Sequence, residues 1–117
     1  MEAEYNALSS SMREVLPLQA LFKAIATQVD LPSVSATFRT TVWEDNIGCE
    51  TLANLDPGQH TPRSKWCDIT AHWFRSKLKP NEVTVERIDT TEQRADIFTK
   101  PLVRVTFEKL RRMLLGW

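Results

Sequence analysis

Hydrophobic residues near the amino end of the chain recur at steps of three and four. This pattern predicts one face of a long amphipathic helix over residues 3–26. The face consists of Tyr5, Leu8, Met12, Val15, Leu16, Leu18, Phe22 and Ile25. Pro17 lies inside the pattern. Because proline lacks an N–H and clashes with the preceding turn, we expect a kink there or a break into two helices.

Two short segments show the alternation that is typical of strands. In residues 37–43 the pattern is β-branched and aromatic, and in residues 82–88 Val83 and Val85 alternate with polar side chains. The chain between them has mainly helical periodicity, which predicts helices over 47–55 and 65–78. Two strands joined by a helical crossover form a parallel, right-handed β-α-β unit. The predicted fold class is therefore α/β.

Two further helices are predicted after the second strand, over residues 91–99 and 103–115. Thr90 followed by Gln93 matches a capping box, so the first of these helices should begin there and end before Pro101. The second helix is amphipathic, and its apolar residues are Val103, Phe107, Leu110 and Leu114.

The composition is that of a single ordinary domain. The chain has 117 residues, 42% of them hydrophobic, which is enough for one core that buries about two-thirds of the unfolded surface. Fifteen Lys and Arg residues balance fifteen Asp and Glu residues. Any affinity for nucleic acid must therefore come from local clusters of charge.

Cysteine and histidine spacing argues against a zinc site and against a disulfide scaffold. Cys49 and Cys67 form no CxxC motif, and His60 and His72 form no HxxxH or HExxH motif. The chain does not begin with a basic segment followed by an apolar run, and it has no apolar stretch of about 18 residues. We expect a reduced intracellular protein, cytoplasmic or nuclear, without a membrane span.

Three acidic residues are candidates for one site. Asp45 follows the first predicted strand, Asp96 lies in the helix after the second, and Glu4 is near the start of the long helix. Ligands of open α/β sheets gather beyond the carboxyl ends of the strands, and acidic oxygens without histidine or cysteine suit Mg²⁺. Fifteen acids make chance groups common, so spacing alone favours an ordinary solvated surface.

Basic residues gather around the predicted helix over 65–78. Arg63, Lys65, Arg75 and Lys77 could contact the phosphates of a nucleic acid. The same residues could equally form a solvated helix face, since charged side chains cover the outer side of most surface helices. The sequence does not decide between these two interpretations.

Other polar and aromatic residues have simpler interpretations. Trp43, Trp66 and Trp73 fall on predicted apolar faces, so we expect them in the core rather than stacked on bases. Asn46 is predicted to cap the helix that follows the first strand. The two cysteines are expected to act as small buried hydrophobes.

Several short blocks occur in an order that is similar to a known family. They are Glu2-Ala3-Glu4-Tyr5-Asn6-Ala7-Leu8, Trp43-Glu44-Asp45-Asn46, Thr61-Pro62-Arg63-Ser64-Lys65, His72-Trp73-Phe74-Arg75, Arg94-Ala95-Asp96-Ile97-Phe98-Thr99-Lys100-Pro101-Leu102 and Gly116-Trp117. Together they resemble the ribonuclease H segment at the carboxyl end of copia-type LTR retrotransposon polyproteins. The resemblance extends over nearly the whole chain.

The resemblance implies a metal-dependent endonuclease that cuts the RNA strand of an RNA/DNA hybrid. In this family two Mg²⁺ or Mn²⁺ ions are held by four acidic residues, three of which match Glu4, Asp45 and Asp96. The implied partners are the hybrid and the upstream reverse transcriptase part of the polyprotein. The fourth acid lies on the first strand of the family's sheet, upstream of the block that contains Glu4.

We therefore expect a truncated ribonuclease H-like fold in which the three leading antiparallel strands and the first catalytic Asp are absent. The two-ion site would be incomplete, the isolated chain inactive, and the uncovered strand edge open to self-association. The alternative is a non-catalytic remnant of a retroelement that binds nucleic acid or protein. A relic without a role is a third interpretation that the sequence does not separate from this alternative.

Overall fold

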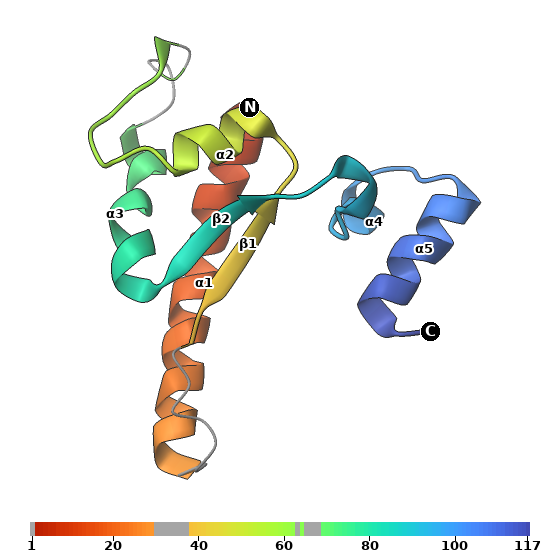
Figure 1. Cartoon of the computed structure of the whole chain (residues 1–117), viewed down its shortest axis with the longest axis horizontal. Coiled ribbons are helices and arrows are strands. Elements are labelled where there is room, and N and C mark those ends of the chain that lie inside the picture. Colours follow the sequence, from red (N-terminus) through yellow and green to blue (C-terminus); the bar gives the residue numbers. More distant parts are fainter. Residues whose placement is uncertain (1, 30–37, 63, 65–68) are drawn as a thin grey trace.

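The chain folds into one long helix, two parallel strands and a series of shorter helices (Figure 1). The computed structural model describes residues 2–29, 38–62, 64 and 69–117. In chain order the elements are α1 (Glu2–Val29), β1 (Thr40–Glu44), α2 (Ile47–Ala53), the 3₁₀ helix η2 (Ile69–His72), α3 (Arg75–Leu78), η3 (Lys79–Asn81), β2 (Val83–Arg87), η4 (Thr90–Glu92), α4 (Asp96–Thr99) and α5 (Arg104–Leu115). The predicted α/β class with two parallel strands is confirmed.

The two strands pair in parallel over their whole length. Thr40 lies opposite Val83 and Glu44 lies opposite Arg87. The N–H of Ile88 donates to the carbonyl of Glu44 at 3.0 Å, which extends the ladder past the end of β2. Both strands therefore end at the same edge, and whatever follows them in sequence is brought to that edge.

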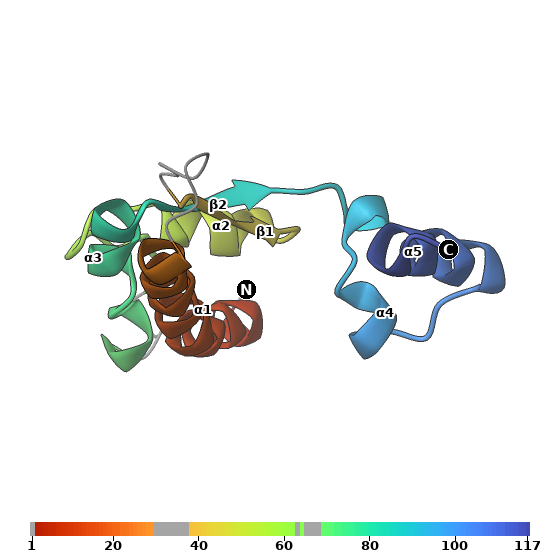
Figure 2. The same ribbon diagram turned by 90° about the horizontal axis from the view of Figure 1, so that it is seen from below.

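The core lies between the first half of α1, α2, α3 and one face of the strands. Its buried residues are Tyr5, Leu8, Met12, Cys49, Leu52, Ala53, Ala71, Phe74, Leu78, Val83 and Val85. Figure 2 shows α1 and α2 on one side of the strands. The alternate residues point to the opposite face and are exposed. Trp43 belongs to them and is 49% exposed, so its predicted core position was wrong.

Helix α1 continues through Pro17, so of the two outcomes expected there, a kink or a break into two helices, the break does not occur. Proline removes the hydrogen bond to the carbonyl four residues earlier, that of Arg13. Arg13 is exposed, and water can take the place of the missing donor. The predicted apolar face is buried only in the first half of the helix, because Leu18 and Phe22 are each 51% exposed.

Gln19 is the buried residue of the second half of α1. Its side-chain amide donates to the carbonyl of Asn81 at 2.7 Å, to the hydroxyl of Thr40 at 3.2 Å and to the carbonyl of Phe38 at 3.3 Å. These contacts join α1 to the beginning of β1 and to the turn before β2. A polar residue thus fixes the position of the long helix where apolar packing is thin.

Several element ends differ from those expected. The helix expected over 3–26 is α1, and those expected over 47–55 and 103–115 are α2 and α5. The strand expected over 37–43 is β1, with residue 37 outside the described part of the chain. The strand expected over 82–88 is β2, which begins one residue later because Glu82 has a left-handed backbone with φ 53°.

The helix expected over 91–99 is not continuous. Asp89 accepts from the N–H of Thr91 at 2.8 Å and begins the short η4 turn, so the capping box predicted at Thr90 does not form. An aspartate cap is as strong as a threonine cap or stronger, and it starts the turn one residue earlier. Gln93 is extended, and α4 follows separately. Of the helix expected over 65–78, residues 65–68 lie outside the described chain, and the rest forms η2 and α3.

Helices α4 and α5 lie beyond the carboxyl ends of the strands, apart from α1 and α3 (Figures 1 and 2). Lys109 ties α5 to the η4 turn through an ion pair with Glu92 and a 3.4 Å hydrogen bond to the carbonyl of Thr91. Leu110 is the buried residue of α5, whereas Phe107 is 43% exposed. Among the described residues, no helix has the length and apolar character needed to cross a membrane.

Candidate functional site

The three acids singled out from the sequence line one cavity of about 470 Å³. Asp45 follows β1 directly, Asp96 is the first residue of α4, and Glu4 lies in the first turn of α1. The cavity is therefore built where the two parallel strands end and where α1 begins. Residues from three parts of the chain that are far apart in sequence thus line the same cavity.

The turn after β1 fixes the position of Asp45. The carboxylate of Glu44 accepts from the backbone N–H of Asn46 at 3.0 Å, and the side-chain oxygen of Asn46 accepts from the N–H of Cys49 at 3.1 Å. Asn46 is thus the N-cap of α2, as predicted. Because the residues on both sides of Asp45 are held, its carboxylate has a defined direction.

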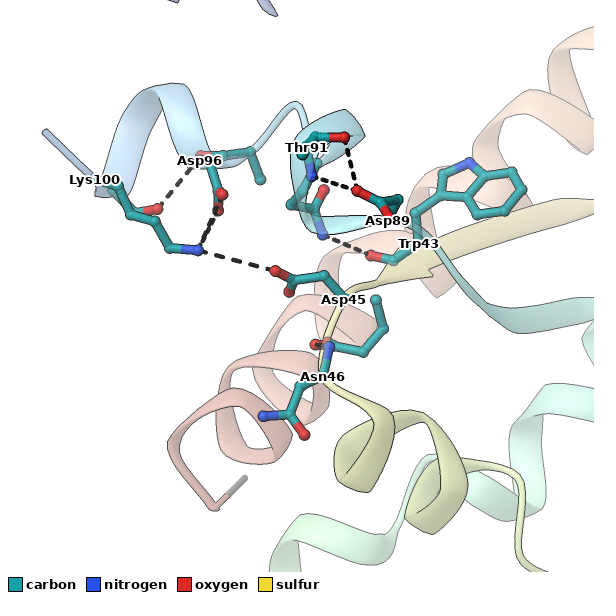
Figure 3. Close-up of polar contacts among 11 residues, drawn as sticks. Trp43, Asp45, Asn46, Asp89, Thr91, Asp96 and Lys100 are labelled. Carbon is teal, nitrogen blue, oxygen red and sulfur yellow. Dashed lines mark hydrogen bonds and ion pairs between the residues drawn. The ribbon is translucent and has the colours of Figure 1, made fainter. Parts of the chain in front are cut away.

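The segment after β2 is folded back onto the end of β1 (Figure 3). The side-chain amide of Gln93 donates to the carbonyl of Trp43 at 3.3 Å. The Asp89 cap turns the chain just before this contact. Together they carry α4, and with it Asp96, to the edge where Asp45 lies.

Lys100 connects the two aspartates. Its ammonium lies 2.9 Å from each carboxylate oxygen of Asp96 and 3.9 Å from one oxygen of Asp45 (Figure 3). The side chain of Asp96 is 11% exposed and that of Asp45 is 22% exposed, whereas that of Lys100 is 49% exposed. The ammonium therefore bridges two partly buried carboxylates from the open side.

The charges around Lys100 favour its protonated form. The hydrogen bond to Asp96 is the largest cause that raises the pKa of Lys100, and the charges of Asp96, Asp45 and Glu4 raise it further. All three predicted acids thus act on one ammonium. Glu44 also lines the cavity, which has four carboxylates and one ammonium among its lining residues.

The donor set has the right chemistry for a hard cation, but its arrangement does not fit two metal ions. Carboxylate oxygens are the ligands that Mg²⁺ prefers. Among the described residues, however, no group of three or more aspartate, glutamate, histidine or cysteine side chains is placed to hold a metal ion. The cation between Asp45 and Asp96 is Lys100, so we derive no reaction step through a metal.

Two of the predicted basic residues, Arg75 and Lys77, differ in their exposure to solvent. Arg75 is 4% exposed, and its guanidinium donates to the carbonyls of Gln59 at 3.0 Å and Leu52 at 3.4 Å. The guanidinium is thus engaged inside the protein, and this burial argues against the phosphate contact predicted for Arg75. Lys77 is exposed on the same helix, whereas Arg63 and Lys65 lie outside the described residues.

Among the described residues, no histidine or cysteine lines the cavity. Cys49 is fully buried, and burial, followed by the charge of Glu44, raises the pKa of its thiol. Cys49 is therefore a small buried hydrophobe, as predicted, while Cys67 lies outside the described residues. His72 shares a 2.8 Å hydrogen bond with the hydroxyl of Tyr5 through its Nδ1.

Sequence reasoning missed two charged residues that line the cavity. Lys100 stands four residues after Asp96 and directly before Pro101, and an acid followed by a lysine at this spacing is a recognisable ion-pair signal. Glu44 stands next to Asp45 at the strand end. No comparable signal reveals the contact between Lys100 and Asp45, because it depends on how α4 folds back.

Comparison with known proteins finds similarity to retroelement polyproteins. The chain is 28% identical over 113 residues to the retrovirus-related Pol polyprotein from transposon RE2 of Arabidopsis thaliana, and 28% identical over 107 residues to that from transposon RE1 of the same plant. These matches cover 97% and 92% of this chain, which spans only 7% of the length of either polyprotein. No protein-family model and no solved structure matches the chain. The similarity supports an origin in a retrotransposon polyprotein.

Proposed function

We propose that this chain is a ribonuclease H-derived segment of a retrotransposon Pol polyprotein. The family activity would be metal-dependent cleavage of the RNA strand of an RNA/DNA hybrid. Two observations support the proposal. The chain is similar to retrovirus-related Pol polyproteins over nearly its whole length, and the acids that the family resemblance selects line one cavity at the carboxyl ends of parallel strands.

The convergence of Glu4, Asp45 and Asp96 is the observation that carries the proposal. Ligand sites in open α/β sheets lie at this edge, and the three acids that the resemblance selects line one cavity there. The roles that we assign to them are those of cation ligands in the complete polyprotein. The partners that follow are the hybrid and the reverse transcriptase part of the same polyprotein.

The isolated chain should cut a hybrid poorly or not at all. Lys100 stands between two of the acids, and the described residues offer no three-ligand group for a metal. A two-ion centre would need additional oxygen ligands and a displaced lysine. The 117-residue chain therefore has the chemistry of part of a centre.

Hybrid cleavage by the purified chain tests this proposal. We expect no cleavage in Mg²⁺ or Mn²⁺ above that of an Asp45→Asn variant. Asp56→Asn is the matched control, because Asp56 is an exposed acid outside the cavity, and its carboxylate pairs with the exposed Lys79 at 3.2 Å. Robust cleavage that Asp45→Asn abolishes and Asp56→Asn retains would show that the chain is a complete nuclease.

The alternative is a non-catalytic segment that binds protein or nucleic acid, and the exposed apolar residues of α1 favour its protein-binding form. Leu18, Leu21, Phe22, Ile25 and Val29 are each about half exposed, and apolar groups that gather on one helix mark many interaction surfaces. The strands of the two-stranded sheet also leave edges without a strand partner in the described chain.

Two measurements separate the candidates. Binding to a hybrid without turnover, weakening steeply with salt, indicates a nucleic-acid-binding segment. Concentration-dependent association in sedimentation, reduced by a Phe22→Asp change, indicates a protein-binding or self-associating segment. If the exposed apolar residues of α1 are ordinary isolated surface positions, the chain should not associate and Phe22→Asp should have no effect.

A further inference from the structure

A second cavity, of about 430 Å³, lies at the other end of the strands from the acidic residues. It is formed by the carboxyl end of α2 and the loop after it, by α3 and η3, and by the first two residues of β2, Val83 and Thr84. Its lining shares no described residue with the cavity of Glu4, Asp45 and Asp96. Whatever this second cavity does is therefore separate from the chemistry of those acids.

The walls of the second cavity are mainly apolar. The apolar residues of its lining are Ala53, Leu55, Pro57, Leu78, Pro80 and Val83. A cavity of this size, with apolar walls and a few polar groups among them, is typical of sites for small molecules. The polar group that distinguishes this one is the guanidinium of Arg75, which belongs to the same lining.

Arg75 carries a buried charge without a counter-ion. The residue is 4% exposed, and among the described residues no carboxylate forms an ion pair with it. Its hydrogen-bond acceptors are two neutral carbonyls. A buried charge that lacks an opposite charge is destabilising, so an anion that reached the guanidinium would relieve this cost.

The hydrogen bonds of Arg75 leave one edge of the guanidinium open for such an anion. Both bonds, to the carbonyls of Gln59 and Leu52, come from Nη1. The Nε is buried and has no hydrogen-bond partner in the described part of the chain. Nε–H and one N–H of Nη2 point in the same direction, and this pair of donors matches the two oxygens of a carboxylate.

The other polar groups of the lining are either engaged or easily moved. The amide of Asn54 donates to two backbone carbonyls at 3.0 Å, and the hydroxyl of Ser76 donates to a third at 3.1 Å. Asp56 and Lys79 form an exposed ion pair at 3.2 Å, and such pairs contribute little stability. Because Nε is buried, a carboxylate must move part of the wall to reach it, and this ion pair can yield at low cost.

We propose that the second cavity binds a small molecule that carries a carboxylate on an apolar body, and that the carboxylate pairs with the Nε–H and Nη2–H of Arg75. The apolar body would lie against Leu55, Leu78 and Val83. The inference is independent of the proposed function, because none of these residues belongs to the site assigned to hybrid cleavage.

Nitrogen NMR of the unchanged 117-residue chain tests the proposal, with benzoate as the probe and benzamide as its uncharged counterpart. The two molecules are similar in size and shape, but only benzoate carries a carboxylate. We expect benzoate to shift the Nε–H signal of Arg75 and to bind at least about tenfold more tightly than benzamide, which corresponds to about 1.4 kcal/mol. Equal binding of the two molecules, or no shift at Arg75, would overturn the proposal.

Two variants on α3 test whether the guanidinium is the group that binds. Arg75→Lys keeps the positive charge but lacks the pair of parallel N–H donors, so it should lower benzoate affinity at least about tenfold. Lys77→Met removes an exposed charge of the same helix that does not line the cavity, and it should bind benzoate like the unchanged chain. Undiminished binding by Arg75→Lys would refute the role of Arg75. The NMR titration of the unchanged chain decides the question if Arg75→Lys does not fold.

Inorganic phosphate tests the class of ligand. Phosphate has a charge but no apolar body, so we expect it to bind at least about tenfold more weakly than benzoate. Phosphate binding as tight as that of benzoate would show a general anion site and would overturn the assignment to carboxylates with an apolar body. Hybrid cleavage is measured without these molecules, so its outcome leaves this proposal untouched, and the failure of benzoate to bind leaves the ribonuclease H assignment untouched.

Discussion

Arg75 and Lys77 lie two residues apart on α3, and the structure gives them opposite roles. Arg75 is buried and Lys77 is exposed. We predict that Arg75→Met lowers the free energy of unfolding and leaves the salt-dependent affinity for a hybrid unchanged. Lys77→Met should leave stability unchanged, and if the chain binds nucleic acid it should reduce affinity and its salt dependence.

The magnitude for Arg75 follows from its contacts. A hydrogen bond from a charged donor contributes about 1.5–3 kcal/mol, and Arg75 makes two, to Gln59 and Leu52. Gln59 is exposed, so its carbonyl regains water, and the carbonyl of Leu52 keeps the N–H of Leu55 at 3.4 Å. The Nε of Arg75 has no hydrogen-bond partner among the described residues, so removing this buried charge also relieves a desolvation cost. We therefore expect a loss of about 2 kcal/mol.

Urea unfolding measures this loss. The midpoint for Arg75→Met should fall with an unchanged m-value, and Lys77→Met should stay within about 0.5 kcal/mol of the parent chain. The reasoning would be refuted if Arg75→Met unfolded like the parent chain and weakened hybrid binding as an exposed phosphate contact does. That result would mean that the Arg75 guanidinium is accessible in solution.

Three further predictions concern stability, pH and reactivity. Gln19→Leu should cost about 1–3 kcal/mol in urea unfolding, because three half-buried acceptors lose the two N–H donors that they share; an unchanged midpoint would contradict this. Hydrogen bonds from the Thr91 hydroxyl and N–H lower the pKa of Asp89 below its ordinary 3.8, so its stabilisation is complete above that value and is lost as the pH falls through the folded pKa. In a carbon NMR titration Thr91→Ala should raise this pKa. In a Cys67→Ser chain, the remaining Cys49 thiol should resist alkylation until the protein unfolds, because it is fully buried; labelling as fast as in urea would contradict its burial.

The shared location of Asp45 and Asp96 was predictable because it follows from chain topology, whereas Glu4, in the first turn of α1, was selected by the family resemblance. A parallel pair of strands sends both carboxyl ends to one edge, so residues just after each strand meet whatever the details of packing. Asp45 needed only the end of β1 to be located, and Asp96 only the end of β2 and a short connection. Errors of one to three residues in the predicted ends did not disturb this outcome.

The burial of single polar side chains was not predictable from pattern. Arg75 and Gln19 look like ordinary exposed positions of amphipathic helices, but both are buried because carbonyl groups from distant segments converge on them. The same limit applies to the second half of α1, whose apolar residues continue the helical period although the described chain leaves them about half exposed. The helical period of apolar residues identifies a helix face that can pack against a partner. It does not show which part of the protein, if any, packs there.

The chain has no net charge, but negative charge is in excess around the cavity at the carboxyl ends of the strands. Its lining includes four carboxylates and one ammonium, and such clusters attract cations even on a neutral chain. The ammonium is also the link between α4 and the end of β1. Removing its charge should therefore have two effects at once, because it leaves the carboxylates of the cavity unbalanced and releases α4 from the strand end.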